Sequence, residues 1–161
     1  MKEERGKNKM ESRKWKVGSL ILVVAFLLSA CSTGEGIEAH EAWARTALQG
    51  ENSAVYLILH NHTEIVDVLI NVSSDVASAV ELHLSEVTSD VMRMSPLESI
   101  EILADDEVQF QSGNYHIMLI GLKKDLNAGD EITITLYFQK YPNIVLNVPV
   151  KNSGDEHQSH P

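Results

Sequence analysis

The 161-residue sequence predicts an all-β domain, a Greek-key β-sandwich. Eight short segments are rich in Val, Ile, Leu, Thr and Tyr, as strands are. One of them, residues 131–138, alternates apolar with more polar side chains, which is the pattern of a strand with one buried face. No window shows a sustained period of 3.6 residues, so we expect at most a short helical turn at residues 74–79.

Turn-forming sequences separate the predicted strands. Gly113-Asn114, residues 127–130 and residues 141–143 combine Gly, Pro, Asn and Asp in the way that short connections do. The predicted strands are residues 53–59, 65–72, 79–84, 99–103, 107–110, 115–122, 131–138 and 143–150.

Residues 1–30 have the pattern of an export signal. Residues 1–16 hold seven Lys and Arg against three Glu, and the apolar run of residues 17–30 is shorter than the roughly 20 residues that span a bilayer. This run ends in Leu28-Ser29-Ala30-Cys31, which resembles the lipobox of bacterial lipoproteins. The resemblance implies cleavage before Cys31 and a lipid on its thiol. An uncleaved signal anchor is the alternative, and both interpretations place the domain outside the cytoplasm.

Three regions follow the signal peptide. Residues 31–38 are the lipidated Cys31 and a flexible tether, residues 39–151 the β-sandwich, and residues 152–161 a disordered tail. Because Cys31 is the only cysteine, the domain has no disulfide and no thiolate ligand. We expect a monomer that is anchored by lipid to the bacterial cell membrane, in the periplasm or on the outer face.

The charge excludes one class of partner. Without residues 1–30 the chain keeps six Lys and Arg and twenty Asp and Glu, a formal charge of −14. Such a surface repels a polyanion, so we expect no binding of nucleic acid. The acidic side chains either solvate the domain or attract cations and basic partner surfaces.

Methionine and histidine carry the chemical signal of this sequence. After the signal peptide, methionine occurs only as Met92, Met94 and Met118. With His83 and His116, Met94 and Met118 form a set of two imidazoles and two thioethers, which suits copper(I) better than other common biological metals. Packing of methionine in the core is the competing interpretation.

Strand geometry predicts how these side chains would meet. A hairpin with its midpoint in residues 88–90 would place His83 directly across from Met94, on one face. His116 and Met118 are two residues apart on one strand, so they also share a face. The two pairs would close around one ion if these strands meet near an end of the sandwich.

The four residues match the signature of a known family, the periplasmic PCu(A)C copper chaperones. Residues 91–94 and 113–122 resemble the most characteristic segments of that family, and the likeness extends over residues 42–150. The resemblance implies a cupredoxin-like β-sandwich that binds one copper(I) through His83, Met94, His116 and Met118. It also implies a carrier, not an enzyme, that passes copper to thiolates of an acceptor such as the CuA centre of cytochrome c oxidase subunit II.

Other candidate ligands carry a weaker signal. Met92 would be a spare thioether, and His157 and His160 in the tail would capture copper(II) or simply be solvated. His60 and His62 could chelate through their spacing, although a turn explains them equally well, and His40 carries no signal.

Several functions are excluded and two alternatives stay open. A blue-copper electron carrier needs a cysteine ligand, which the domain lacks, and no Gly-x-Ser-x-Gly or His-Glu-x-x-His motif indicates a hydrolase. A metal-free, lipid-anchored β-sandwich that serves interaction or assembly is the first alternative. A copper storage or resistance protein, which would bind several ions per chain, is the second.

Overall fold

The structure, a computed structural model, describes residues 36–88 and 91–154. These residues form ten strands: β1 (Ile37–Arg45), β2 (Ser53–Asn61), β3 (Asp67–Ser73), β4 (Ala77–Thr88), β5 (Val91–Leu97), β6 (Ile100–Ile102), β7 (Asp106–Phe110), β8 (Tyr115–Leu122), β9 (Glu131–Phe138) and β10 (Ile144–Lys151). In this part of the chain, no helix is long and apolar enough to cross a membrane. The predicted signal peptide, Cys31, His157 and His160 lie outside the described residues.

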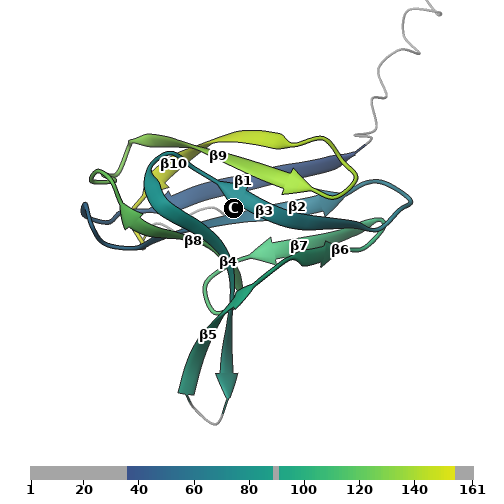
Figure 1. The fold of residues 1–161 in the computed structure, drawn as a ribbon, viewed down its shortest axis with the longest axis horizontal. Helices are drawn as coiled ribbons and strands as arrows, with labels where there is room; N and C mark the ends of the chain where they lie inside the picture. The colour runs from purple at the N-terminus through teal and green to yellow at the C-terminus, as the bar shows by residue number, and fades with distance from the viewer. Residues whose placement is uncertain (1–35, 89–90, 155–161) are drawn as a thin grey trace, which may run out of the picture. The chain divides into compact units, whose positions relative to one another are not determined.

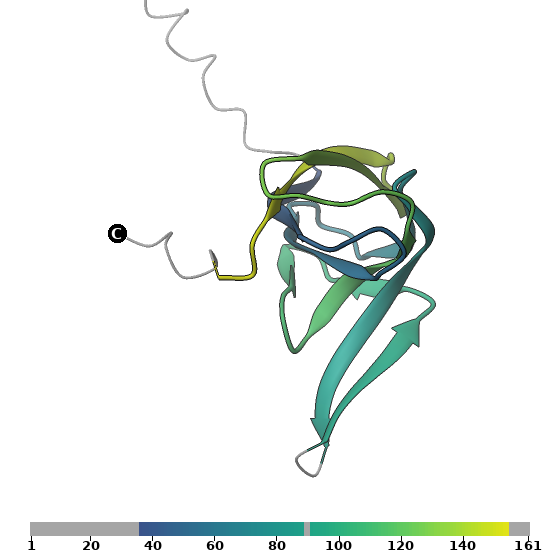
Figure 2. The ribbon, with the colours of Figure 1, turned by 90° about the vertical axis from the view of Figure 1, so that its left-hand side faces the viewer.

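The strands form one hydrogen-bonded sheet that is folded into two facing layers. The order is β5-β4-β8-β7-β2-β1-β10-β9-β3-β6. The first six strands make one layer and the last four the other, and a short parallel pairing of β1 with β10, at Ala44 and Val150, joins them. Figures 1 and 2 show the two layers from two sides. The predicted all-β class is therefore confirmed.

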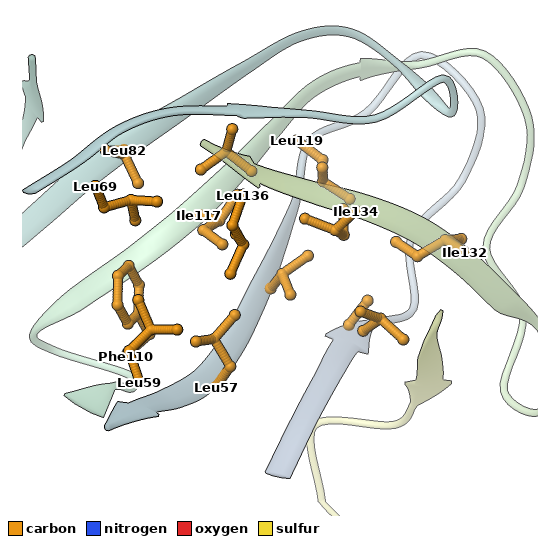
Figure 3. Packing of buried hydrophobic residues seen from close by; sticks show 14 of the residues in the cluster. Leu57, Leu59, Leu69, Leu82, Phe110, Ile117, Leu119, Ile132, Ile134 and Leu136 are labelled. Carbon is orange, nitrogen blue, oxygen red and sulfur yellow. The ribbon is translucent and has the colours of Figure 1, made fainter. Parts of the chain in front are cut away.

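The core lies between the two layers and is built by alternation along the strands. In β9, Ile132, Ile134 and Leu136 are buried while the residues between them are more exposed. Figure 3 shows these three side chains in one apolar cluster with Ile117 of β8 and Leu57 of β2. Burial of apolar surface is the main force that holds such layers together, at about 25 cal/mol per Å².

All eight predicted strands are present, and two further strands, β1 and β5, were missed. β8 and β9 have the predicted bounds, whereas β1 and β5 lack the apolar alternation on which the prediction relied. Residues 74–76 form a bend and residues 77–79 already belong to β4, so the expected helical turn is absent from residues 74–79. β1 begins two residues before the expected start of the domain, and β10 ends at its expected end, Lys151.

The hairpin of β4 and β5 extends beyond the body of the two layers (Figures 1 and 2). Six of the seven β5 residues are exposed, and none is buried. An antiparallel pair that buries neither face needs no apolar alternation, which explains why the sequence pattern did not reveal β5. The other end of β4 pairs with β8, so this hairpin is anchored in the layer that carries the candidate ligands.

One fully buried amide fixes the loop that follows β2. The Asn61 side chain is 0% exposed, and its Nδ2 donates hydrogen bonds to the carbonyls of Ile65, Ile102 and Leu103. Its Oδ1 accepts hydrogen bonds from the backbone N–H and the hydroxyl of Thr63. The side chain thus links the end of β2 to the connection between β6 and β7.

We predict that Asn61→Asp lowers the free energy of unfolding by about 3 kcal/mol, because a buried carboxylate would face three carbonyl oxygens with no hydrogen to donate. Urea denaturation followed by circular dichroism measures the change. The control is Asn71→Asp on β3, where the residue is exposed and the change should be within about 0.5 kcal/mol. Equal effects of the two substitutions would contradict this role of Asn61.

Candidate metal centre

The ladder between β4 and β8 brings two candidate ligands side by side. His83 pairs directly with His116, and Glu81 pairs with Met118. Their neighbours Leu82 and Ile117 are buried in the core, so the histidines lie on the opposite, outer face of the layer. The rings of His83 and His116 have centroids 5.7 Å apart. The expectation that these two strands meet is correct.

The ladder between β4 and β5 confirms the hairpin but corrects its register. Met94 lies across from Ser85, and His83 lies across from Pro96, not from Met94. The ladder continues to the pair Thr88 and Val91, which leaves only residues 89 and 90 for the connection. With this short connection, the centre of the hairpin lies one residue later in the sequence than predicted. Each β4 residue is therefore paired with a β5 residue two positions later than predicted. A shift of two preserves the face, so Met94 still shares the face of His83.

His83 is the geometric centre of the four candidate ligands. His116 is its direct neighbour on β8, and Met118 is its diagonal neighbour on the same strand. Met94 is its diagonal neighbour on β5, on the other side of β4. Diagonal neighbours in an antiparallel sheet are about 7–8 Å apart, within reach of long side chains. One face therefore presents both imidazoles and both thioethers around His83.

A carboxylate orients the His83 ring. Its Nε2 lies 2.9 Å from Oε2 of Glu81, which is two residues earlier on the same face. With the Nε2 proton donated to this carboxylate, the lone pair is on Nδ1. That Nδ1 is buried and has no hydrogen-bond partner within the protein. The His83 side chain is only 12% exposed, so its free nitrogen is largely shielded from bulk water.

A backbone carbonyl orients the His116 ring in the complementary way. Its Nδ1 lies 3.1 Å from the carbonyl oxygen of Asn114, which also accepts the backbone N–H of Ser85 at 3.1 Å. Gly113, with φ of 79°, supplies the left-handed residue of the turn that presents this carbonyl. The lone pair of His116 is then on Nε2, which is also buried and without a partner within the protein.

The unpaired polar atoms concentrate on this one patch. Among the described residues, the buried side-chain N and O atoms without a hydrogen-bond partner in the protein are His83 Nδ1, His116 Nε2 and Ser85 Oγ. Leaving such an atom unpaired costs about 1–3 kcal/mol, so native proteins rarely do so without a reason. In each ring one nitrogen is held by a hydrogen bond and the other nitrogen has no partner within the protein. Histidine binds a metal in this arrangement.

The thioethers differ in their exposure. Met118 is half-buried and pairs with the small Ala54 of β2 on its other side. Met94 is 54% exposed, and Met92, which pairs with Val87 farther out on the hairpin, is 59% exposed. Met92 shares the face of Met94 but lies farther from His83 along the ladder. Its role as a spare ligand stays a prediction.

The residues that orient the two histidines were not predicted from the sequence. Glu81 could have been found from its position two residues before His83, since residues i and i+2 of a strand share a face. Ser85, two residues after His83, could have been found in the same way, whereas the Asn114 carbonyl is a backbone group and carries no comparable signal.

A known lipoprotein family matches the chain. The family described as "Putative lipoprotein LpqE-like" matches residues 37–150. An uncharacterized protein of Rickettsia prowazekii, RP573, is 36% identical over 119 residues, which are 71% of this chain and 66% of that relative. The chain thus spans slightly less than two thirds of the length of this relative. "Putative lipoprotein Lxx21020" of Leifsonia xyli is 28% identical over 127 residues, 78% of this chain and 76% of the relative.

Solved structures with the same fold are PCuAC domains. A copper-bound PCuAC domain from PmoF2 has a TM-score of 0.61 and 23% identity, over 72% of this chain and 92% of that domain. The copper(I) form of DR1885 from Deinococcus radiodurans has a TM-score of 0.57 and 22% identity, over 78% of this chain and 87% of that protein. The cupredoxin-like fold that the sequence resemblance implied is confirmed.

We predict that Ser85→Ala raises the free energy of unfolding of the metal-free protein by about 1 kcal/mol, because it removes a buried hydroxyl that has no partner within the protein. The matched control is Ser53→Ala, which should lower the same quantity by about 1 kcal/mol, since the Ser53 hydroxyl donates a hydrogen bond to the Arg45 carbonyl at 2.6 Å. Chemical denaturation of the two variants measures both. A loss of stability in Ser85→Ala equal to that in Ser53→Ala would show that Ser85 is satisfied after all.

Proposed function

We propose that this chain, which belongs to the LpqE-like family, is an extracytoplasmic copper(I) carrier that passes its ion to thiolates of an acceptor protein. The proposed ligands are His83, Met94, His116 and Met118. The observation that carries the proposal is the pair of buried imidazole nitrogens, His83 Nδ1 and His116 Nε2, on adjacent positions of β4 and β8. The other nitrogen of each ring is held by a hydrogen bond, to Glu81 in His83 and to the Asn114 carbonyl in His116.

The donor set favours copper(I) over other metals. Thioether sulfur is a soft ligand that binds copper(I) well and zinc(II) or magnesium(II) poorly, and neutral imidazole suits copper in both oxidation states. Copper(I) has a filled d shell and imposes no strict geometry, so it tolerates ligands that come from three different strands. The copper-bound PCuAC domain and the copper(I) form of DR1885, which share this fold, support the same choice of metal.

The exposure of the site supports transfer rather than storage. Thioethers bind copper(I) less tightly than thiolates do, so an acceptor with cysteines would take the ion by ligand exchange. Met94 is the exposed ligand, and Val87 and Met92 on the same face of the hairpin are exposed as well. An exposed apolar group around a metal ligand is a suitable contact surface for a partner. We propose the CuA centre of cytochrome c oxidase subunit II as the acceptor.

A lipid anchor would place the carrier beside a membrane-bound acceptor. The family and the Leifsonia xyli relative are described as lipoproteins, and Cys31 follows the sequence expected of a lipobox. We propose that Cys31 carries the lipid and that the β-sandwich stands on the extracytoplasmic side of the bacterial cell membrane. His157 and His160 remain proposed auxiliary ligands for copper(II).

We predict that the purified protein competes with a chromophoric copper(I) chelator at a stoichiometry of one ion per chain. Met94→Ile and Met118→Ile should each weaken binding at least tenfold, about 1.4 kcal/mol, because each removes one soft donor while it keeps an apolar side chain of similar size. His83→Ala should weaken binding further. The titration is followed by the absorbance of the chelator complex under anaerobic, reducing conditions.

Met92→Ile is the matched control for these variants, since Met92 is on the same hairpin and the same face but farther from His83. Its effect should be smaller than that of Met94→Ile. No competition by the wild-type protein would leave the metal-free interaction module as the better function. Several ions per chain would favour storage or resistance.

We also predict that the copper(I)-loaded protein transfers its ion to a metal-free CuA domain. Separation of the two proteins after mixing, followed by copper analysis of each, measures the transfer. A CuA domain with its cysteines replaced by serine should gain no copper, because the driving force is the exchange of thioethers for thiolates. If the wild-type domain also gains none, the acceptor assignment is wrong, whereas the copper(I) site itself would stand.

A further inference from the structure

A second group of candidate ligands lies on the same outer face, on strands β7, β2 and β1, which are neighbours in the sheet (Figure 1). His60 of β2 pairs with Glu107 of β7 on one side and with Glu38 of β1 on the other. His40 of β1 pairs with Ile58, so it is a diagonal neighbour of His60. One ligand atom from each of His40, His60 and Glu107 lies within 4.8 Å of the other two.

The surroundings of these three residues hold them in place. The Glu107 carboxylate accepts a hydrogen bond from Nε2 of Gln109 at 2.7 Å through Oε1, which leaves Oε2 for another partner. The His62 ring stacks on His60 with a centroid distance of 3.8 Å, and its Nε2 lies 3.5 Å from the Glu38 carboxylate. The His62 ring, just after β2, therefore packs against the His60 ring.

A local irregularity of β1 contributes to the position of His40. The ladder with β2 shifts register between His40 and Trp43, and Glu41 in this interval has a φ of 54°, which a residue with a side chain seldom adopts. Such bulges re-aim a side chain and are frequent beside functional sites. Here the bulge directly follows one of the three candidate ligands.

We propose that His40, His60 and Glu107 form a second metal site, which binds a divalent cation of borderline softness, zinc(II) or copper(II). Two imidazoles and one carboxylate are hard-to-borderline donors, a set that suits these ions and disfavours copper(I). Ligand atoms at about 2.0–2.2 Å from a tetrahedral ion are about 3.3–3.6 Å apart. The ligand atoms, which lie within 4.8 Å of one another, therefore approach by at most about 1.5 Å on binding. The fourth position is left for water or a further ligand.

This second site goes beyond the proposed copper(I) carrier function and shares no residue with the first site. The two donor sets would bind different metal ions on one surface. The set on β4, β5 and β8 would bind a soft ion, and the set on β1, β2 and β7 would bind a divalent ion. A negative binding result at one site would therefore not contradict the proposal for the other site.

The test is a zinc(II) titration of the metal-free protein by isothermal calorimetry, in the background His83→Ala/His116→Ala, which removes the imidazoles of the first site. We expect one zinc(II) per chain in that background. His40→Gln, His60→Gln and Glu107→Gln should each weaken binding at least tenfold. The control Glu101→Gln alters an exposed carboxylate on β6, outside the group, and should leave the affinity unchanged. Circular dichroism of each variant verifies folding.

Two-dimensional NMR of the amides locates the ion and distinguishes this site from the tail histidines. Zinc(II) should shift amides near residues 40, 60 and 107, and copper(II) should broaden the same signals if it is accepted as well. A competition between the two ions then decides which one the site prefers. Shifts confined to residues 155–161, or no binding in the His83→Ala/His116→Ala background, would overturn the proposal.

Discussion

The pairing of β4 with β8 is the constraint on which the candidate copper site depends. Leu82 and Ile117 face the core, and the adjacent His83 and His116 must therefore face outward. A slip of one residue would bury two imidazoles among apolar side chains and expose two large apolar residues. Because burial of the core strongly opposes that slip, the same force that folds the sandwich also aligns the two histidines.

The orientation of the histidines is a separate matter from their position. Each ring has one nitrogen in a hydrogen bond, to the Glu81 carboxylate in one case and to the Asn114 carbonyl in the other, and one nitrogen that is buried and unpaired. Unpaired buried atoms reduce stability, and three of them gather here. A cost of that kind is typical of a site whose geometry serves binding, because an ordinary surface would pair these atoms or expose them to water.

In this fold, the candidate ligands lie on the outer face of the larger layer. The inner face is committed to the apolar core, and each strand of the layer turns every second side chain outward. The candidate copper(I) ligands and the group of His40, His60 and Glu107 both use these outward positions. The two groups differ in their donor atoms, sulfur and nitrogen in the first and nitrogen and oxygen in the second, and the proposed metals differ for that reason.

From the sequence alone, the fold class and the bounds of β8 and β9 could be predicted, because strand alternation is a property of local sequence. The four soft and borderline donors could be named as candidate ligands from their chemistry. β1 escaped prediction because a bulge interrupts its alternation, and β5 because a hairpin outside the body buries no face. Tertiary structure alone decided that Met94 lies opposite Ser85, that Glu81 and Asn114 orient the two rings, and that His40, His60 and Glu107 come together. These are cross-strand relations, and the register that sets them depends on the burial of the whole core and on the length of the connections, not on any one segment.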